Sequence, residues 1–288
     1  MIEKDVVEAV GHSVVQHGEL NNRIYLMKLA PEDLPGILDR LDDLARDRGY
    51  TKIFAKVSEQ HEEAFLSRAY RREGRIPGFY RGTAHGVFLG RYYAQERMTD
   101  ARDAVVNKNL TLARSRASKA QVHAEDRGLQ IGLADPGSAE EMAAVYREVF
   151  ASYPFPIHDP EYIRETMASH VRYFYAKEHG RIIALSSAEF DVENLNVEMT
   201  DFATLPQCRG RSIAVRLLAL MEDDPAVQQM KTAYTIARSL SPGMNITFAR
   251  HGYAYGGTLV NNTNISGSIE SMNIWYKALE GTAVGTGP

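Results

Sequence analysis

In the first third of the chain, apolar residues recur with the period of a strand in some segments and with the period of a helix in others. Between Pro31 and Gly49 the apolar residues recur at the 3.6-residue spacing of a helix, with proline at its start and glycine at its end. A second helix is predicted from Ser58, its N-cap, to Ala69. Strand-like segments occur at 23–29, 52–57, 74–80 and 86–93. The predicted order is β-α-β-α-β-β.

The rest of the chain continues the α/β alternation after a charged stretch. Residues 94–128 favour helix and contain no proline, so we expect a connecting helix there. Beyond it the pattern predicts the order α-α-β-β-β-α-β-α-β-β. We therefore divide the chain into an N-terminal α/β domain at 1–93, the connecting helix at 94–128, a larger α/β domain at 129–280 and a flexible tail at 281–288.

The two halves carry an internal similarity. When Ser58 is set against Ser241, the same offset aligns Ile53 with Ile236, Phe65 with Phe248 and Tyr70 with Tyr253. We interpret residues 23–93 as a degenerate partial copy of the second half of the C-terminal domain. A chance likeness between two short β-α-β units is the alternative.

Composition and charge narrow the class of protein. The 288 residues are 44% hydrophobic and 24% charged, and the net charge of -4 with dispersed arginines argues against nucleic-acid binding. Cys208 is the only cysteine, which excludes an internal disulfide and fits a reducing cytoplasm. The N-terminus lacks a signal-peptide layout, and no apolar run is long enough to span a membrane. The nine histidines show no metal-ligand spacing, so we expect a cytoplasmic protein without metal, membrane or nucleic-acid partner.

The stretch 206–214 has the composition of an anion-binding loop. An apolar strand at 199–205 runs into it, and a helix follows. The first backbone N–H groups of a helix have no internal partners and lie at the positive end of its dipole, so they bind phosphate. Gly210 allows close approach of the backbone, and Arg209 and Arg211 add positive charge.

The spacing Gln207-x-x-Gly210-x-Ser212 resembles the acyl-CoA pyrophosphate loop of the GNAT N-acetyltransferase superfamily, and the element order of 129–280 resembles its fold. An ordinary strand-to-helix turn with surface arginines is the alternative for the loop alone. The resemblance implies an α/β fold with a mixed sheet, in which a C-terminal GNAT acyltransferase domain follows a smaller, degenerate half-GNAT-like domain. It also implies acetyl-CoA as co-substrate, bound by Phe202, Ala203, Thr204, Gln207, Arg209, Gly210, Arg211, Ser212, Ile213, Ala214, Asn245 and Phe248.

The sequence departs from the family pattern at three of its usual positions. Phe248 stands where the family often has a tyrosine that protonates the leaving thiolate, and Ser241 stands where an asparagine is usual. Ser212 replaces the last small residue of the loop motif. Because a CoA-type thiol has a pKa of about 8.5, its thiolate leaves tolerably well and water can protonate it. The departures leave open a non-catalytic acyl-CoA-binding regulatory module.

Attack by an amine requires a base. A lysine-like ammonium, with a pKa of about 10.4, costs roughly 4.6 kcal/mol to deprotonate at pH 7. Glu198 and Asp201 lie on the strand before the loop, where the family often places a carboxylate. Residues three apart in a regular strand point to opposite faces, so we expect one of the two to face the cleft. We favour Glu198 as the catalytic base and Asp201 as a cation-binding residue; carboxylates that merely face water are the alternative.

Three segments are candidates for the acceptor pocket. An acidic strand at 189–193 would attract a cation, although a solvated hairpin face has the same pattern. An amide-rich run at 261–268 offers donors and acceptors for a zwitterion, and a plain polar turn is its alternative. A loop at 153–160 lies where this fold carries its acceptor-gating loop, although its prolines alone would explain rigidity. The candidate substrate-binding residues are Tyr153, Phe155, Glu189, Asn262 and Asn264.

Four short strings, at 76–80, 152–156, 198–204 and 260–265, resemble the β-lysine N6-acetyltransferase family. That likeness implies transfer of an acetyl group to the terminal amine of (3S)-3,6-diaminohexanoate, giving the compatible solute Nε-acetyl-β-lysine. Acetylation of another small diamine or of a protein lysine is the alternative. We expect the N-terminal domain to pack against the catalytic sheet or against a second subunit of a homodimer, and to help close the acceptor pocket.

Overall fold

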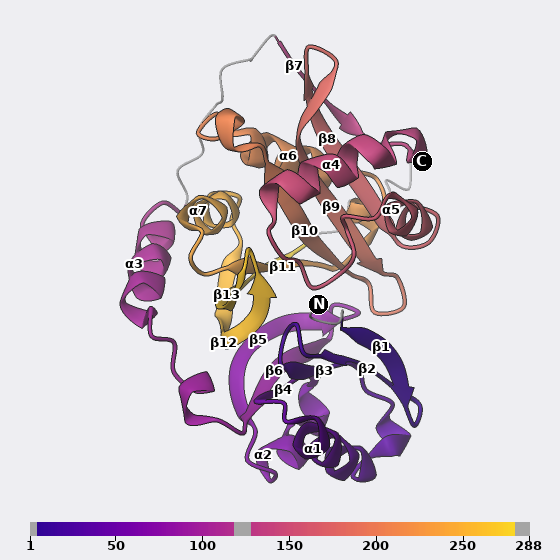
Figure 1. The fold of residues 1–288 in the computed structure, drawn as a ribbon, viewed down its shortest axis with the longest axis vertical. Coiled ribbons are helices and arrows are strands. Elements are labelled where there is room, and N and C mark those ends of the chain that lie inside the picture. The colour runs from indigo at the N-terminus through magenta and orange to yellow at the C-terminus, as the bar shows by residue number, and fades with distance from the viewer. Residues whose placement is uncertain (1–4, 118–127, 280–288) are drawn as a thin grey trace, which may run out of the picture.

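A sheet of thirteen strands runs through both halves of the protein in the computed structural model, which describes residues 5–117 and 128–279 (Figure 1). The order of its strands is β1-β2-β3-β4-β6-β5-β12-β13-β11-β10-β9-β8-β7. The predicted tail at 281–288 and residues 118–127 of the predicted connecting helix lie outside the described residues. Within the described ranges, no helix is both long and apolar enough to cross a membrane.

The N-terminal half places its two α-helices on the face of the sheet that points away from the C-terminal half (Figure 1). Its apolar core lies between α1 and the sheet, as the helix period of 31–49 predicts. The elements are β1 Val6–Val10, β2 Ser13–Gly18, β3 Arg23–Lys28, α1 Gly36–Arg48, β4 Lys52–Ser58, α2 Glu62–Leu66, β5 Arg71–Tyr80 and β6 Ala84–Tyr92.

The sequence pattern does not predict β1 and β2. The first four residues of β1 are exposed, so no apolar period marks this strand. In β2, the Ser13 hydroxyl donates to Asp33 at 2.6 Å, and the His17 ring lies within 3.0 Å of both Glu8 and Tyr50. Polar side chains whose hydrogen-bond partners come from distant segments leave no strand signal in the sequence.

The predicted connecting helix at 94–128 is shorter in the structure. An α-helix, α3, covers Asp103–Arg114 and packs along α7 (Figure 1). The residues before it turn back toward the sheet because Arg97 is buried there. Its guanidinium donates to the carbonyl oxygen of Asn21 at 2.8 Å and to that of Asn261 at 2.7 Å. Helix propensity is overridden at this point by a buried cation that ties three segments together.

The C-terminal half has the predicted order of elements, preceded by one further strand, β7. The strands form a mixed sheet with α4 and α5 on one face and α6 and α7 on the other, each pair with its own buried cluster. The elements are β7 Leu129–Leu133, α4 Ala139–Val149, α5 Pro160–Met167, β8 Val171–Glu178, β9 Arg181–Asp191, β10 Asn196–Thr204, α6 Ile213–Glu222, β11 Thr232–Arg238, α7 Pro242–Arg250, β12 Ala254–Ile265 and β13 Ser268–Ala278.

The two halves repeat one pattern of strand pairing. The order β1-β2-β3-β4-β6-β5 corresponds to β8-β9-β10-β11-β13-β12, and β3 is parallel to β4 as β10 is to β11. Phe65 and Tyr70 pack edge to face with ring centroids 5.1 Å apart, and Phe248 and Tyr253 do so at 5.0 Å. In both pairs the tyrosine N–H donates to the phenylalanine carbonyl. The repeat extends beyond residues 23–93, because it includes β1 and β2.

The halves join edge to edge where β5 pairs with β12 through Gly74 and Gly257. Gly257 has a φ of 143°, and a Cβ atom there would lie 2.1 Å from the carbonyl oxygen of Glu73. Only glycine permits this approach. Lys52 crosses the joint and donates to the carbonyl oxygen of Val260 at 2.7 Å. The two halves of the sheet are therefore held in a fixed relation.

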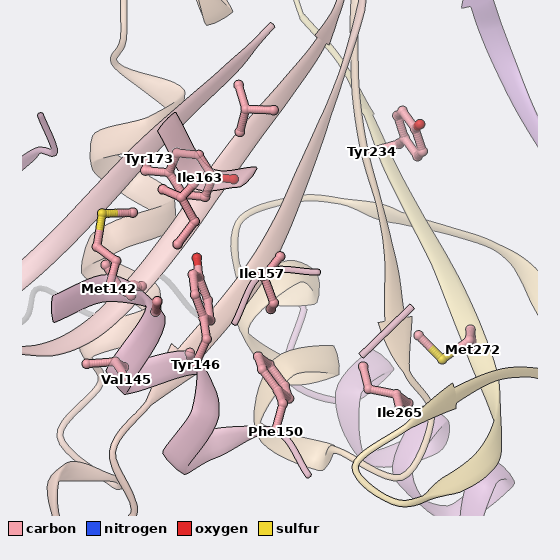
Figure 2. Packing of buried hydrophobic residues seen from close by; sticks show 14 of the residues in the cluster. Met142, Val145, Tyr146, Phe150, Ile157, Ile163, Tyr173, Tyr234, Ile265 and Met272 are labelled. Atoms are coloured by element: carbon pink, nitrogen blue, oxygen red, sulfur yellow. The ribbon is translucent and has the colours of Figure 1, made fainter. Parts of the chain in front are cut away.

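One buried cluster is shared between the halves. It combines Phe54 and Phe88 of the N-terminal sheet with side chains of α4, of the loop that follows it and of the C-terminal strands. Figure 2 shows Phe150 and Ile157 lying between the side chains of α4 and those of Ile265 and Met272. The face of the N-terminal sheet that carries no helix thus packs against the C-terminal half.

Candidate active site

The shared cluster encloses a cavity of about 150 Å³. Arg23, Tyr25 and Phe54 line it from the N-terminal half, and the ends of β9 and β10 line it from the C-terminal half. The sequence-predicted residues that line this cavity, called the acceptor cavity below, are Tyr153, Phe155, Glu189, Glu198, Asp201, Phe202, Phe248 and Asn262. Residues that lie far apart in the sequence are therefore brought to one place.

Glu198 and Asp201 both line the acceptor cavity, so the prediction that only one of them would face it is wrong. The reason is a β-bulge in β10. Thr200 pairs with Ser187 and Ala203 with Leu185, which leaves Asp201 and Phe202 opposite a single residue of β9. Asp201 takes a left-handed φ of 54° at this bulge. A bulge interrupts the strand alternation and redirects a side chain, here a carboxylate, to the other face.

The electrostatic surroundings of Glu198 suit a proton acceptor near neutral pH. Removal from water raises the pKa of its carboxyl to about 7, and the charge of Glu189 adds to that effect. Lys56 and a hydrogen bond from Tyr234 act in the opposite direction. Burial also raises the pKa of the Glu189 carboxyl, although 46% of that side chain is exposed. Glu198 thus has a pKa matched to general base catalysis.

Asp201 is held in place through both of its carboxylate oxygens. One accepts a hydrogen bond from the Tyr153 hydroxyl, and the other accepts one from the Ser187 hydroxyl at 2.5 Å. Burial raises the pKa of Asp201 above its ordinary value, although these two hydrogen bonds lower it. This pairing connects the bulge in β10 to the loop after α4, and it orients the Tyr153 ring at the cavity.

Lys56 of β4 supplies the positive charge that faces these acidic groups from the N-terminal half. Burial alone lowers the pKa of its ammonium, but Tyr25, Glu198, Tyr80 and Glu189 together raise it above the ordinary value. The ammonium therefore stays charged and offsets part of the repulsion between the carboxylates. Sequence reasoning missed this residue. A charged residue inside the strand-like segment 52–57 was the signal that could have found it.

Beyond Glu198, β10 and β11 separate. Their parallel pairing covers Asn196–Glu198 and does not continue toward the loop. The backbone groups of the following β10 residues on that side are left without a strand partner, and residues of β11 line the same cavity. Such a gap can accept an extended ligand that pairs with the strand edge. This is the splayed strand that the resemblance to GNAT proteins predicts.

A second cavity, of about 490 Å³, opens between the loop at 206–214 and α7. Gly210 and Ser212 both have left-handed φ values, of 80° and 58°, a backbone conformation that recurs in anion-binding turns. A Cβ atom built on Gly210 would meet nothing within 4 Å, so the loop surface is open. Arg250, which the sequence analysis missed, lines this cavity with a buried Nε that has no hydrogen-bond partner. The donors fit a pyrophosphate, as acyl-CoA binding requires.

Not every predicted cofactor residue reaches this second cavity. Its lining includes Phe202, Thr204, Arg209, Gly210, Arg211, Ser212, Ile213 and Ala214. Gln207 is exposed and lines neither cavity, and Ala203 is buried in the core. Arg211 forms an ion pair with Glu178 at 2.7 Å. Within the described residues, no group of His, Cys, Asp or Glu side chains could hold a metal ion.

Asn245 and Asn264, predicted to bind ligands, line neither cavity. The Asn245 amide is fully buried and used internally: it accepts from Trp275 at 2.9 Å and donates to the carbonyl of Ser241 at 2.7 Å. The Asn264 amide donates to the carbonyl of Leu20 at 2.9 Å and so ties β12 to the N-terminal half. Both amides hold the fold together.

Phe248 lies fully buried between two other aromatic rings. Its ring packs edge to face against Phe202 at 5.6 Å and against Tyr253 at 5.0 Å. It forms part of the wall of the acceptor cavity, and its apolar ring has no proton to give.

Comparison with known proteins agrees with this geometry. Residues 142–241 match the acetyltransferase (GNAT) family. The chain is 38% identical over 275 residues to the β-lysine N(6)-acetyltransferase of Methanococcus maripaludis, covering 94% of this chain and 98% of that protein. It is 30% identical over 276 residues to the N-acetyltransferase YodP of Bacillus subtilis, covering 93% and 96%. A β-lysine N(6)-acetyltransferase of Methanosarcina mazei is 40% identical over 152 residues, which are 53% of this chain and 56% of that protein.

These similarities confirm the predicted mixed α/β GNAT fold and the enzyme class. They extend over nearly the whole chain and so include the N-terminal half that lines the acceptor cavity. The chain therefore belongs to the GNAT family of N-acetyltransferases, enzymes that use acetyl-CoA as their acetyl donor.

Proposed function

We propose that this enzyme acetylates the terminal amine of β-lysine to give Nε-acetyl-β-lysine. The observation that carries the proposal is a cavity lined by three carboxylates, one with a pKa near 7, beside a splayed strand. A proton-accepting carboxylate and acidic neighbours suit an ammonium substrate. The relative from Methanococcus maripaludis bears this activity in its name and matches across both halves.

The carboxyl of Glu198 acts as the base. Bound acetyl-CoA supplies the acetyl group as a thioester. Transfer of a proton from an ammonium with a pKa of about 10.4 to Glu198 costs roughly 4.6 kcal/mol of free energy, because the two pKa values differ by about 3.4 units. With the ordinary glutamate pKa of 4.5, the same transfer would cost roughly 3.4 kcal/mol more. The raised pKa thereby lowers the cost of forming the free amine.

Other residues hold the reactants around Glu198. Asp201 orients Tyr153 and adds negative charge near the ammonium. The free edge of β10 after the bulge faces the thioester, and the N–H groups of the loop at 209–214 bind the pyrophosphate, with Arg209 and Arg250 adding charge. Because Phe248 has no proton to give, the thiolate leaves as such and takes its proton from water.

The chemistry of the product explains its use. β-Lysine carries two ammonium groups and one carboxylate, and acetylation of one amine leaves a net-neutral zwitterion. Such a molecule can accumulate without counterions, so we propose a compatible solute formed in the cytoplasm during osmoadaptation. Assembly as a homodimer stays a prediction.

The test measures amine-dependent CoA release by the purified enzyme. Parallel assays contain acetyl-CoA with β-lysine, α-lysine, small diamines or a lysine peptide, and mass spectrometry locates the acetyl group. We expect the highest kcat/KM with β-lysine and acetylation at its terminal amine. A higher kcat/KM with a diamine or a peptide would replace the proposed acceptor, and acetylation at the 3-amino group would overturn the proposed orientation.

A further inference from the structure

A buried arginine of the N-terminal half faces the acceptor cavity without an acidic partner. Arg23 is 4% exposed and lines the cavity from β3. Its Nη1 donates to the carbonyl oxygen of Asn262 at 2.5 Å and to Thr263 Oγ1 at 3.1 Å. Its Nε has no hydrogen-bond partner, and no carboxylate of the described residues lies within ion-pair distance of its guanidinium. A buried guanidinium with a free donor is costly unless a ligand completes it.

The surroundings of Arg23 carry an excess of positive charge. Lys52 and Arg97 are buried beside it, and Asp5 and Glu73 are the carboxylates whose charges act on Arg23. The Lys52 ammonium binds Glu73 at 2.8 Å. Arg97 donates to backbone carbonyls and to the Thr51 hydroxyl. Two negative charges for three cations leave a net positive charge around Arg23, which favours an anion.

The carboxylates of Glu198 and Asp201 line the same cavity from β10. Tyr25, two residues along β3 from Arg23, interacts with the charges of both Arg23 and Glu198, whereas the carboxylates whose charges act on Arg23 itself are Asp5 and Glu73. Beside Arg23, the Asn262 side chain is 1% exposed and its Oδ1 has no hydrogen-bond partner. A carbonyl oxygen of this kind accepts hydrogen bonds from an ammonium. The cavity thus carries a cation from the N-terminal half and carboxylates from the C-terminal half, with a free acceptor next to the cation.

We infer that Arg23 binds the carboxylate of the acceptor, so that the N-terminal half selects amino acids whose carboxylate lies at the far end from the reacting amine. The inference rests on the proposed function, whose acceptor has this layout, and it adds a specificity-determining residue from outside the catalytic domain. Asn262 Oδ1 receives the 3-ammonium group beside that carboxylate. Diamines and peptide lysines lack a free carboxylate at this position and leave Arg23 unpaired.

The experiment compares matched acceptors on the full-length enzyme. One pair is β-lysine and 1,4-diaminopentane, which is β-lysine without its carboxylate; the other is 6-aminohexanoate and pentylamine. Wild type, R23M and R23K are assayed for kcat/KM with each acceptor. Arg48, exposed at the end of α1, provides the control variant R48M. The KM for acetyl-CoA and the melting temperature report on the integrity of each variant.

We expect wild type to prefer the carboxylate member of each pair by about 10- to 100-fold, the range for a charge-assisted hydrogen bond. R23M should lose this preference through KM, R23K should keep part of it, and R48M should keep all of it. An unchanged preference in R23M would overturn the inference even if β-lysine is the acceptor. If R23M does not fold, absence of the preference in wild type would overturn it. A preferred acceptor other than β-lysine would overturn the proposed function, and the carboxylate preference would still test Arg23.

Discussion

Glu198 of β10 and Glu189 of β9 lie directly opposite each other in an antiparallel pair. Like charges in this position repel, and the repulsion is relieved when one carboxyl keeps its proton. Burial is the larger cause of the raised pKa of Glu198, about 7, and the charge of Glu189 adds to it. The arrangement therefore holds a carboxyl that gains and loses its proton in the range in which the enzyme works.

The first prediction concerns the pH dependence of catalysis. If the ammonium form binds and Glu198 accepts its proton, kcat/KM should fall about tenfold per pH unit below an apparent pKa near 7 and be level just above it. E198Q should lose this limb and reduce kcat by roughly 10²- to 10⁴-fold. Initial rates between pH 5.5 and 8.5 measure both. A kcat/KM that keeps rising tenfold per unit from pH 7 to 8.5 would mean that the free amine binds and would contradict this role.

The second prediction concerns stability. The folded-state pKa of Glu198 lies above its unfolded value of 4.5, so the folded protein binds more protons between these values and loses stability as pH rises from about 4.5 through 7. E198Q should therefore raise the unfolding free energy by roughly 3 kcal/mol at pH 8 and have little effect near pH 4. Urea denaturation at the two pH values measures this. E165Q, at an exposed position of α5, should change neither.

The charge of Lys56 should set the pH below which kcat/KM falls, called the acidic limb here. Its charge lowers the pKa of Glu198, so K56M should move the limb of kcat/KM to higher pH, whereas K56R should leave it near 7. The same series of rate measurements checks the direction. A limb that stays in place or moves to lower pH in K56M would show that the ammonium does not act on Glu198.

The glycine joint between the halves should tolerate no side chain. G257A would place its Cβ 2.1 Å from the Glu73 carbonyl oxygen, so we expect a loss of about 3 kcal/mol or more in unfolding free energy. G36A is the control, because a Cβ there meets nothing within 4 Å and alanine favours the helix. Denaturant unfolding compares the two variants. Equal stability of G257A and wild type would mean that the joint can open without cost.

Arg250 should contribute to binding of the donor. R250M should raise the KM for acetyl-CoA by about tenfold, because a charge-assisted hydrogen bond to a phosphate is lost, and should leave kcat nearly unchanged. R147M, at an exposed position of α4, is the matched control. Steady-state kinetics at saturating acceptor measures the effect. A drop in kcat with an unchanged KM would assign Arg250 another role.

Most helices and strands of the C-terminal half can be predicted from the sequence, because local sequence signals and tertiary structure agree there. The helix period, the loop glycine and the motif around Gly210 all mark the same strand-loop-helix unit. The bulge at Asp201 leaves no such signal, since it depends on how β9 pairs with β10. Arg23 and Lys56 were missed for a similar reason. Their role appears only when two strands of the N-terminal half face a cavity built largely by the other half.

The repeated strand order has a consequence for how such an enzyme changes its substrate. Both copies carry a register shift, between Val14 and Val15 in the β2–β3 pairing and between Thr200 and Ala203 in the β9–β10 pairing, but the anion-binding loop at 206–214 lies in the C-terminal copy. The N-terminal copy contributes Arg23, Tyr25 and Phe54 to the acceptor cavity and no residue to the donor cavity. Changes on β3 and β4 can therefore alter which amine is accepted while the donor cavity keeps its sequence.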